Sequence, residues 1–414
     1  MMEELNRSIS WRCPVRLPRE TYPMAAEIAT HLPGLTPAQR RGMTWWVYGT
    51  ILAGSACQSA VVLALLPLAG VRAAHAVRQL LREWLYAGTD KVTPCQEQVD
   101  VTACFGPLLR WVLAWWQGDA VPLALDATYL RDRVVVLSVS VLYRGTAIPV
   151  AWHVTAANRT GAWLTPSLAL LDALAPAVPA DQTVLLLLAD RGLWSPRLWR
   201  AAQRHGWHPL LRIRPDAIFR PTGGTRVPAR ALIAGPGHAW VGTGVAFSQA
   251  ARYLPATLIV VWETDQAAPW LVLTDLAPEA VGPAWYGLRV WVELGFRALK
   301  RLGWHWERTR RTAPDRVARH WLVLAVATLW VVATGTRAED AARLGREPAH
   351  LRVATPPPAV PFVRTVSVVT RGLVRLRWQL LRTRRLWRTR WLWPEPWPDL
   401  AETVQLTVVA TLPP

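Results

Sequence analysis

The amino-acid sequence predicts an α/β protein, in which a mixed β-sheet with a β-rich insertion lies between a helical N-terminal region and a basic, helical C-terminal region. The hydrophobic pattern is helical up to about residue 118 and changes to the apolar runs of strands from residue 121. After residue 303 it returns to a long apolar helix and an arginine-rich segment. A chain of 414 residues is long enough for two or three domains. The expected units are a helical domain at 1–118, an α/β domain made of 119–213 and 283–335, a β-rich insertion at 214–282 and a basic region at 336–414.

The charge of the chain predicts a polyanionic partner. The formal net charge is +19 and the isoelectric point is about 11.2, which is typical of proteins that bind DNA or RNA. Of 47 basic residues only Lys91 and Lys300 are lysine. GC-rich coding explains the choice of arginine over lysine better than it explains the excess of base over acid.

The cysteines and the apolar runs indicate in which cellular compartment the protein is expected. Four cysteines without C-x2-C spacing argue for a reducing compartment and against a zinc site or a disulfide framework. The N-terminus lacks the layout of a signal peptide. The run 51–70 contains polar residues and a proline, and the run 321–334 is shorter than the ~20 residues of a spanning helix. We therefore expect buried core helices and a cytoplasmic, nucleoid-associated protein with no membrane partner; a membrane protein is the alternative.

The first 118 residues contain apolar positions at helical spacing. Thr36-Pro37 is a typical cap-and-proline start of a helix. Arginines in this region could bind DNA ends, but no helix-turn-helix spacing is present, so helices that only pack together remain an equal alternative. The expected helices are 37–47, 51–66, 73–86 and 105–117.

From residue 121 the elements follow the order three strands, helix, strand, helix, strand. Arg144-Gly145 forms the predicted tight turn between the second and third strands. This is the order of a ribonuclease H-like domain, in which the first and fourth strands lie side by side and parallel. The expected strands are 121–130, 133–143, 146–154, 183–189 and 208–213, with helices at 164–174 and from Ser195-Pro196 to 205.

Two aspartates stand where such a sheet would place a site. Asp126 interrupts the apolar first strand, and Asp190 ends the apolar run of the fourth. Carboxyl ends of adjacent parallel strands meet at one edge of the sheet, so the two carboxylates are expected to lie together. The alternatives are that Asp126 caps a turn and that Asp190-Arg191-Gly192 is an ordinary strand-to-helix turn.

A third candidate lies on a helix predicted at 285–300, between Gly282-Pro283 and Gly303. Its other faces are apolar, so we expect the helix to be buried and its polar stripe to line a cleft. An ordinary buried helix with an internal Arg289–Glu293 pair is the alternative. The stripe contains Tyr286, Arg289, Glu293, Arg297 and Lys300.

The spacing Tyr-x2-Arg-x3-Glu-x6-Lys in this helix resembles the signature of DDE transposases of the insertion-sequence-four type. Asp126-x-Thr128 and Asp190-x-Gly192 also look like the first and second catalytic motifs of that family. The resemblance implies that Glu293 is the third catalytic carboxylate and that Tyr286, Arg289 and Lys300 contact DNA; Arg297 shares their stripe. It also implies an insertion of β-strands between Asp190 and Glu293, which are 103 positions apart, and runs at 226–233, 238–247, 257–263 and 270–276 have strand character.

This resemblance implies a metal-dependent reaction on DNA. Asp126, Asp190 and Glu293 would hold two Mg²⁺ ions, with Mn²⁺ as a substitute, because hard divalent cations prefer carboxylate oxygens. The expected function is cut-and-paste transposition of a bacterial insertion sequence on double-stranded DNA, by a homodimer on paired ends. The alternatives are an inactive or repurposed transposase that only binds DNA, and a ribonuclease-like hydrolase of the same fold.

Further residues carry weaker expectations. Trp262 and Trp270 could stack on a displaced base, although core packing is the simpler expectation. His153 could touch DNA, although a core histidine is expected. The segment 364–390 predicts a basic amphipathic helix that contacts a DNA backbone or a membrane surface, or presents a solvated face. Prolines at 356–361 and 394–398 suggest extended linkers.

Overall fold

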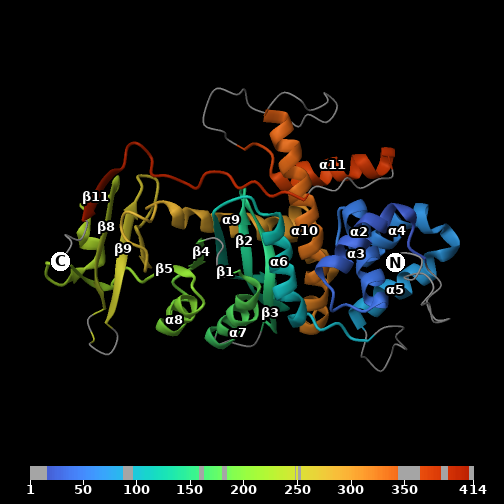
Figure 1. The fold of residues 1–414 in the computed structure, drawn as a ribbon, viewed down its shortest axis with the longest axis horizontal. Coiled ribbons are helices and arrows are strands. Elements are labelled where there is room, and N and C mark those ends of the chain that lie inside the picture. The colour runs from blue at the N-terminus through green and yellow to red at the C-terminus, as the bar shows by residue number, and fades with distance from the viewer. Residues whose placement is uncertain are drawn as a thin grey trace.

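A computed structural model describes residues 16–86, 97–157, 163–179, 184–247, 249, 253–343, 364–383 and 390–409. The molecule is elongated, with helices α2 to α5 at one end, the sheet in the middle and strands β8, β9 and β11 at the other end (Figure 1). Lys91, Cys13, Cys95, the prolines at 356–361 and the arginines at 384, 385 and 388 lie outside the described residues.

The N-terminal region is helical, as predicted. The Thr36 side chain accepts a hydrogen bond from the Gln39 amide, and the Gln39 side chain accepts one from the Thr36 amide, which forms a capping box. The single helix predicted at 51–66 is wrong, because Gly54 has the left-handed conformation (φ 58°) that ends a helix. The chain turns by 96° before the next helix begins. The helices are α2 (Tyr22–His31), α3 (Pro37–Ala53), α4 (Gln58–Ala69), α5 (Ala74–Tyr86) and α6 (Phe105–Trp115).

The first five strands have the predicted connectivity. Their order in the sheet is β3-β2-β1-β4-β5, with β1, β2 and β3 antiparallel and β1, β4 and β5 parallel. Both residues of the turn Arg144-Gly145 have positive φ (43° and 74°), as a type I′ hairpin requires. Leu125 pairs with Ala189, so the residues that follow them, Asp126 and Asp190, are neighbours. The strands are β1 (Ala120–Leu130), β2 (Val134–Tyr143), β3 (Thr146–Ala156), β4 (Val184–Ala189) and β5 (His208–Arg212).

The strands that follow β5 extend this sheet. β10 pairs antiparallel with β5, and β9, β8, β6 and β7 follow in order, while β11 pairs parallel with β8. The strand predicted at 226–233 is wrong: only Val227–Pro228 is extended, because proline has no amide to continue the ladder, and a 3-10 turn follows. The strands are β6 (Ile218–Pro221), β7 (Val227–Pro228), β8 (His238–Ala246), β9 (Leu254–Trp262), β10 (Trp270–Thr274) and β11 (Gln405–Val409).

Helix α10 (Pro314–Arg343) contains the apolar run 321–334 and extends beyond it at both ends. It lies between the sheet and the N-terminal helices (Figure 1). Among the described residues it is the helix that is by itself long and apolar enough to cross a membrane, and the bent pair α3–α4 passes the same test together. However, 94% of its apolar window is buried inside the fold. The prediction of a core helix is therefore confirmed.

Two glycines set the distance between α10 and α11 (Val368–Thr383). A Cβ atom on Gly335 would collide with the Val368 carbonyl oxygen, and one on Gly372 would collide with the Val331 carbonyl oxygen. The two backbones are therefore in direct contact. α11 is the predicted basic helix, but Arg371 on it is buried rather than facing solvent, whereas Arg377 and Arg382 are exposed.

The segment 390–409 runs along the sheet to β11 (Figure 1). Arg390 forms an ion pair with Glu27 on α2, and Leu392 exchanges backbone hydrogen bonds with Trp115 and Gln117. Trp397 packs edge-on against Trp285, with 4.7 Å between ring centroids. Residues 394–398, which were predicted as an extended linker, form no helix or strand and pack against the domain through Trp397.

The charged contact that fixes this segment is buried. Glu339 is fully buried and lies between Arg144 (3.1 Å) and Arg364 (2.8 Å). Burial opposes the charge on Glu339, but its hydrogen bonds to Arg364 and the nearby arginines outweigh this and lower its pKa. Arg364 also pairs with Glu395, at 2.7 Å, so the network joins the end of α10 to the C-terminal segment.

We expect Gly335→Ala to destabilise the protein by about 2 kcal/mol, because overpacking costs about 1–3 kcal/mol and rigid backbone opposes the new methyl group. This outweighs the ~1 kcal/mol by which alanine favours a helix over glycine. Urea denaturation followed by circular dichroism measures the change. Gly235→Ala is the control, since nothing lies within 4 Å of its added Cβ; equal stability of the two variants would contradict the close crossing.

Candidate active site

The two predicted aspartates lie side by side at the edge of the sheet. Asp126 Oδ1 accepts a hydrogen bond from the Ala127 amide at 2.8 Å, and Asp190 Oδ1 accepts one from the Arg191 amide at 2.7 Å. Each carboxylate therefore has one oxygen held by its own backbone, and the second oxygen, Oδ2, points toward the same neighbour, Arg289.

Arg289 joins all three predicted carboxylates. Its Nη2 lies 2.9 Å from Asp126 Oδ2 and 3.8 Å from Asp190 Oδ2, and its Nη1 lies 3.2 Å from Glu293 Oε1. The three acids come from β1, from the end of β4 and from α9 (Val290–Arg297). The structure therefore brings together all three residues that the sequence singled out as catalytic.

The charges in this cluster are unequal, because three carboxylates face one guanidinium. Burial raises the pKa of Asp126, and repulsion from Asp190 and Glu293 raises it further. Arg289 and the Ala127 amide lower this pKa, but by less, so it stays above its ordinary value. Burial also disfavours the charge on Arg289, but the carboxylates outweigh it and raise its pKa. The site is thus short of positive charge.

The helix that carries Arg289 and Glu293 changes its winding along its length. Trp285–Arg289 is a 3-10 helix, Val290–Arg297 is α-helical, and Ala298–Leu302 is a π-helix. The prediction of one helical segment is confirmed in outline. The prediction that its other faces are buried is wrong at Val290, which is 48% exposed.

Tyr286 and Gly295 position this helix. Tyr286 is buried, its hydroxyl donates to the Ala189 carbonyl at 3.4 Å, and its ring packs edge-on against Trp270. Burial therefore raises the Tyr286 pKa well above its usual value. A Cβ on Gly295 would lie 2.8 Å from the Ala147 amide nitrogen, so α9 rests directly on β3. Sequence reasoning missed Gly295, although a glycine inside a helical pattern is a signal of close packing.

The remaining predicted contacts differ in accessibility. The burial of Tyr286 does not support the direct DNA contact expected of it, because its hydroxyl faces the end of β4. Arg297 is exposed. Lys300 is half-buried, and its pKa is lowered by burial and by repulsion from Arg301.

The structure also shows the surroundings of Trp262, Trp270 and His153. Trp262 Nε1 donates to the Gln266 carbonyl, and Trp270 packs on Tyr286, as expected for packing roles. The expectation that His153 is a core residue is wrong. β3 is buried only as far as Trp152, so His153 lies exposed on its uncovered end.

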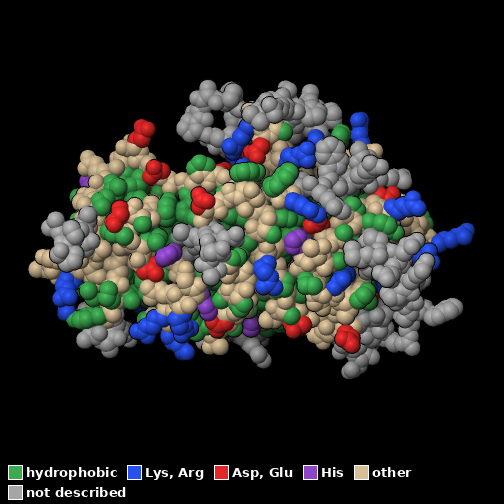
Figure 2. All heavy atoms as spheres, in the orientation of Figure 1, with side chains coloured by type: hydrophobic (Ala, Val, Ile, Leu, Met, Phe, Trp, Pro, Cys, Tyr) green, Lys and Arg blue, Asp and Glu red, His purple; other side chains and the backbone are tan. Residues whose placement is uncertain are grey.

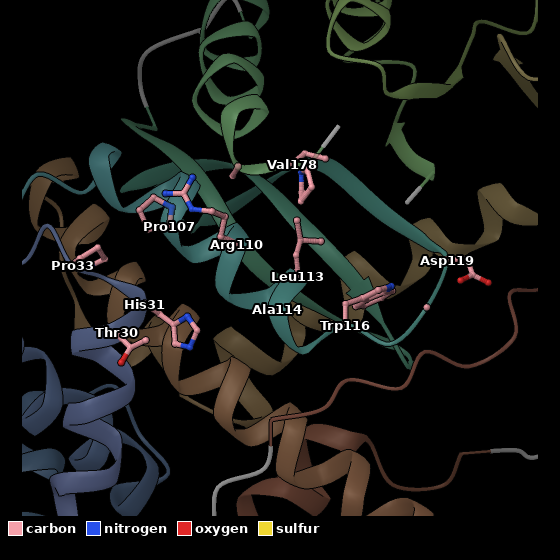
Figure 3. A pocket seen from close by; sticks show the side chains of 13 residues that line it. Thr30, His31, Pro33, Pro107, Arg110, Leu113, Ala114, Trp116, Asp119 and Val178 are labelled. Carbon is pink, nitrogen blue, oxygen red and sulfur yellow. The ribbon is translucent and has the colours of Figure 1, made fainter. Parts of the chain in front are cut away.

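A large cavity lies apart from this cluster. It has a volume of about 870 Å³, lies at α2 and α6, and is lined by none of the three carboxylates (Figure 3). Its lining includes Arg110 and Asp119, whose charges are opposite, and His31, which stacks on Trp111. The carboxylate cluster is therefore the stronger candidate for chemistry.

The geometry defines an acidic site at the carboxyl edge of a mixed α/β sheet. A helix covers this site and supplies the Glu293 carboxylate and the Arg289 guanidinium. Residues 130–330, just under half of the chain, match the family model described as transposase DDE domain. The matched range contains Asp190 and Glu293, and Asp126 lies just before it. No curated protein matches the chain. The match supports a DDE transposase with transposase-type nuclease activity, for which DNA is the implied partner.

We expect Asp126→Asn to raise the melting temperature at neutral pH. The pKa of Asp126 is higher in the folded protein than in the unfolded chain, so the protonated carboxyl stabilises the fold. This stabilisation is complete when the pH is below 3.8, the ordinary pKa, and is lost as the pH rises through the pKa of the folded protein. The gain should therefore shrink toward low pH. Melting followed by circular dichroism between about pH 4 and pH 8 tests this, with exposed Asp132→Asn as the control; a lower melting temperature for Asp126→Asn at neutral pH would contradict it.

Proposed function

We propose that the protein is a DNA transposase of a bacterial insertion sequence, of the insertion-sequence-four type, which binds the ends of its element and cleaves and joins DNA by a cut-and-paste route. The observation that carries this proposal is that Asp126, Asp190 and Glu293, from segments far apart in the chain, all lie around the Arg289 guanidinium. The strand order β3-β2-β1-β4-β5 supports a ribonuclease H-like catalytic domain.

The donor chemistry of the cluster fits divalent cations. Asp126, Asp190 and Glu293 would hold Mg²⁺, with Mn²⁺ as a substitute, because their oxygens already surround one positive charge and are the ligands that such ions prefer. In the described arrangement no three His, Cys, Asp or Glu side chains are grouped to hold a metal ion, since Arg289 lies between the acids. When bound, the ions would supply positive charge at the scissile phosphate.

The protein's own side chains would bind and orient the DNA. Arg297 and Lys300 extend the basic stripe along the helix beyond Glu293, where they would contact phosphates flanking the cleaved bond. Arg289 presents a planar fork suited to a phosphate once it leaves the carboxylates. Tyr286 would act as a positioning residue through its bond to the end of β4. We also propose double-stranded DNA as ends and target, a homodimer on paired ends, and a cytoplasmic, nucleoid-associated location.

The carboxylate assignment is tested by cleavage of a labelled duplex that carries the element's own ends, with Mg²⁺ or Mn²⁺. Asp126→Ala, Asp190→Ala and Glu293→Ala should each bind the duplex but cut it at least about 100-fold more slowly, since even groups that only support metal ligands contribute 10–100-fold. Asp132→Ala, in the exposed turn between β1 and β2, is the control. Cutting at the normal rate by any of the three variants would refute the site, and a wild type that binds without cutting would favour a repurposed DNA-binding protein.

Arg289 and a divalent cation would compete for the same oxygens. We therefore expect Arg289→Ala to bind Mn²⁺ roughly tenfold more tightly than wild type in the absence of DNA, a difference of about 1.4 kcal/mol. Electron paramagnetic resonance of free Mn²⁺ measures the affinity without any catalytic assay. Arg297→Ala removes the same charge from an exposed position of the same helix and is the matched control. Weaker Mn²⁺ binding by Arg289→Ala would show instead that this guanidinium holds the carboxylates in place.

A further inference from the structure

A second basic surface begins at Asp190 and follows helix α8 (Pro196–Arg204). Ser195 caps this helix by accepting a hydrogen bond from the Leu198 amide, and the apolar face, including Leu198 and Trp199, is buried. Arg197, Arg200 and Arg204 are exposed and fall within about 60° of one another around the helix axis. Figure 2 shows basic side chains gathered over α8. We call these three arginines together with exposed Arg191 the α8 basic face.

The α8 basic face is continuous with the carboxylate cluster. Arg191 follows Asp190 directly, and its amide holds Asp190 Oδ1. A cavity of about 530 Å³ opens beside it, lined by Arg191, Arg214, Asp216 and Trp194 among others. The Trp194 ring, which forms part of the wall of this cavity, packs against Trp199 and Phe247. The α8 basic face is therefore joined to the carboxylate cluster through Arg191 and the short loop that leads to α8.

The charge of this face is not neutralised within the described part of the chain. None of its four arginines forms an ion pair with another described residue, in contrast to Arg144, Arg319 and Arg364, which are all paired with acids. Acidic side chains do lie near the C-terminal end of α8, where Asp172 contacts His205 and Asp275 contacts Gln203 and His208. They leave the first two turns of α8 basic, as a surface for phosphates requires.

The two basic surfaces lie on different sides of the carboxylates. The helix with Arg297 and Lys300 packs on β1, β2 and β3, whereas α8 packs on β5 and α7 (Leu164–Leu174). A joining reaction must bring two duplexes to one set of carboxylates, and one basic surface can hold only one of them. The first surface is the one proposed above for the element's ends.

We propose that the α8 basic face binds the phosphate backbone of the target duplex, the DNA into which the element is inserted. This inference rests on the proposed function and adds where the second DNA lies. Contacts to phosphates carry no sequence information, so binding through this face would be insensitive to target sequence and sensitive to salt.

The test compares Arg197→Gln/Arg200→Gln with Arg220→Gln/Arg230→Gln, which removes two exposed arginines from the insertion. Three properties are measured: cleavage at the element's ends, transfer of pre-cut ends into a plasmid, and capture of a short non-specific duplex by protein loaded with pre-cut ends. The α8 variant should cleave ends like wild type, while transfer falls roughly tenfold and the slope of log affinity against log salt in the capture assay falls by about 1.8, at 0.9 for each lost phosphate contact. The control pair should leave all three properties at wild-type levels.

The outcomes separate this inference from the proposed function. Normal transfer and an unchanged salt slope in the α8 variant would overturn the inference while leaving the transposase assignment intact. A parallel loss of end cleavage would also overturn it, because α8 would then hold the element's ends. If wild type does not cleave ends at all, the proposed function fails on that assay alone.

Discussion

The contact between Arg289 and Asp126 is the interaction on which the site depends. Asp126 lies on β1 and Arg289 precedes α9, so this ion pair joins the sheet to the helix that carries Glu293. The same guanidinium also reaches Asp190 and Glu293, and without a cation at this point three carboxylates would repel one another at the edge of the sheet. The pairing of β1 with β4, the Tyr286 hydroxyl on the Ala189 carbonyl and the contact of Gly295 with β3 all serve to hold these charges in register.

Much of this arrangement was predictable from the sequence, because it depends on local patterns. The apolar runs that end at Asp190 and surround Asp126 define buried strands, and parallel pairing of such strands leaves their carboxyl ends at one edge. The helix break at Gly54 follows a local signal, a glycine in the left-handed conformation, which the apolar run around it concealed. The exposure of His153 could not be predicted locally, because it depends on where neighbouring elements stop covering β3.

The insertion shows a similar limit. Turn residues and apolar runs predicted the approximate positions of β8, β9 and β10, but they did not predict β6, and the run at 226–233 is extended only at Val227–Pro228. That β10 pairs with β5 depends on the free edge that the parallel strands leave, which is a property of the assembled sheet. Strands β8, β9 and β10 continue the sheet that carries the carboxylates. They therefore cannot move over the site as a hinged lid without breaking backbone hydrogen bonds.

The C-terminal segment links regions that the order of the chain keeps apart. Arg390 contacts the N-terminal helices, Leu392 and Trp397 contact the sheet domain and the helix that carries Arg289, and β11 pairs with β8. Local opening of any one of these regions would release contacts that also stabilise the others. The C-terminal segment therefore couples the stabilities of these regions, so that weakening one of them lowers the free energy of opening of the others.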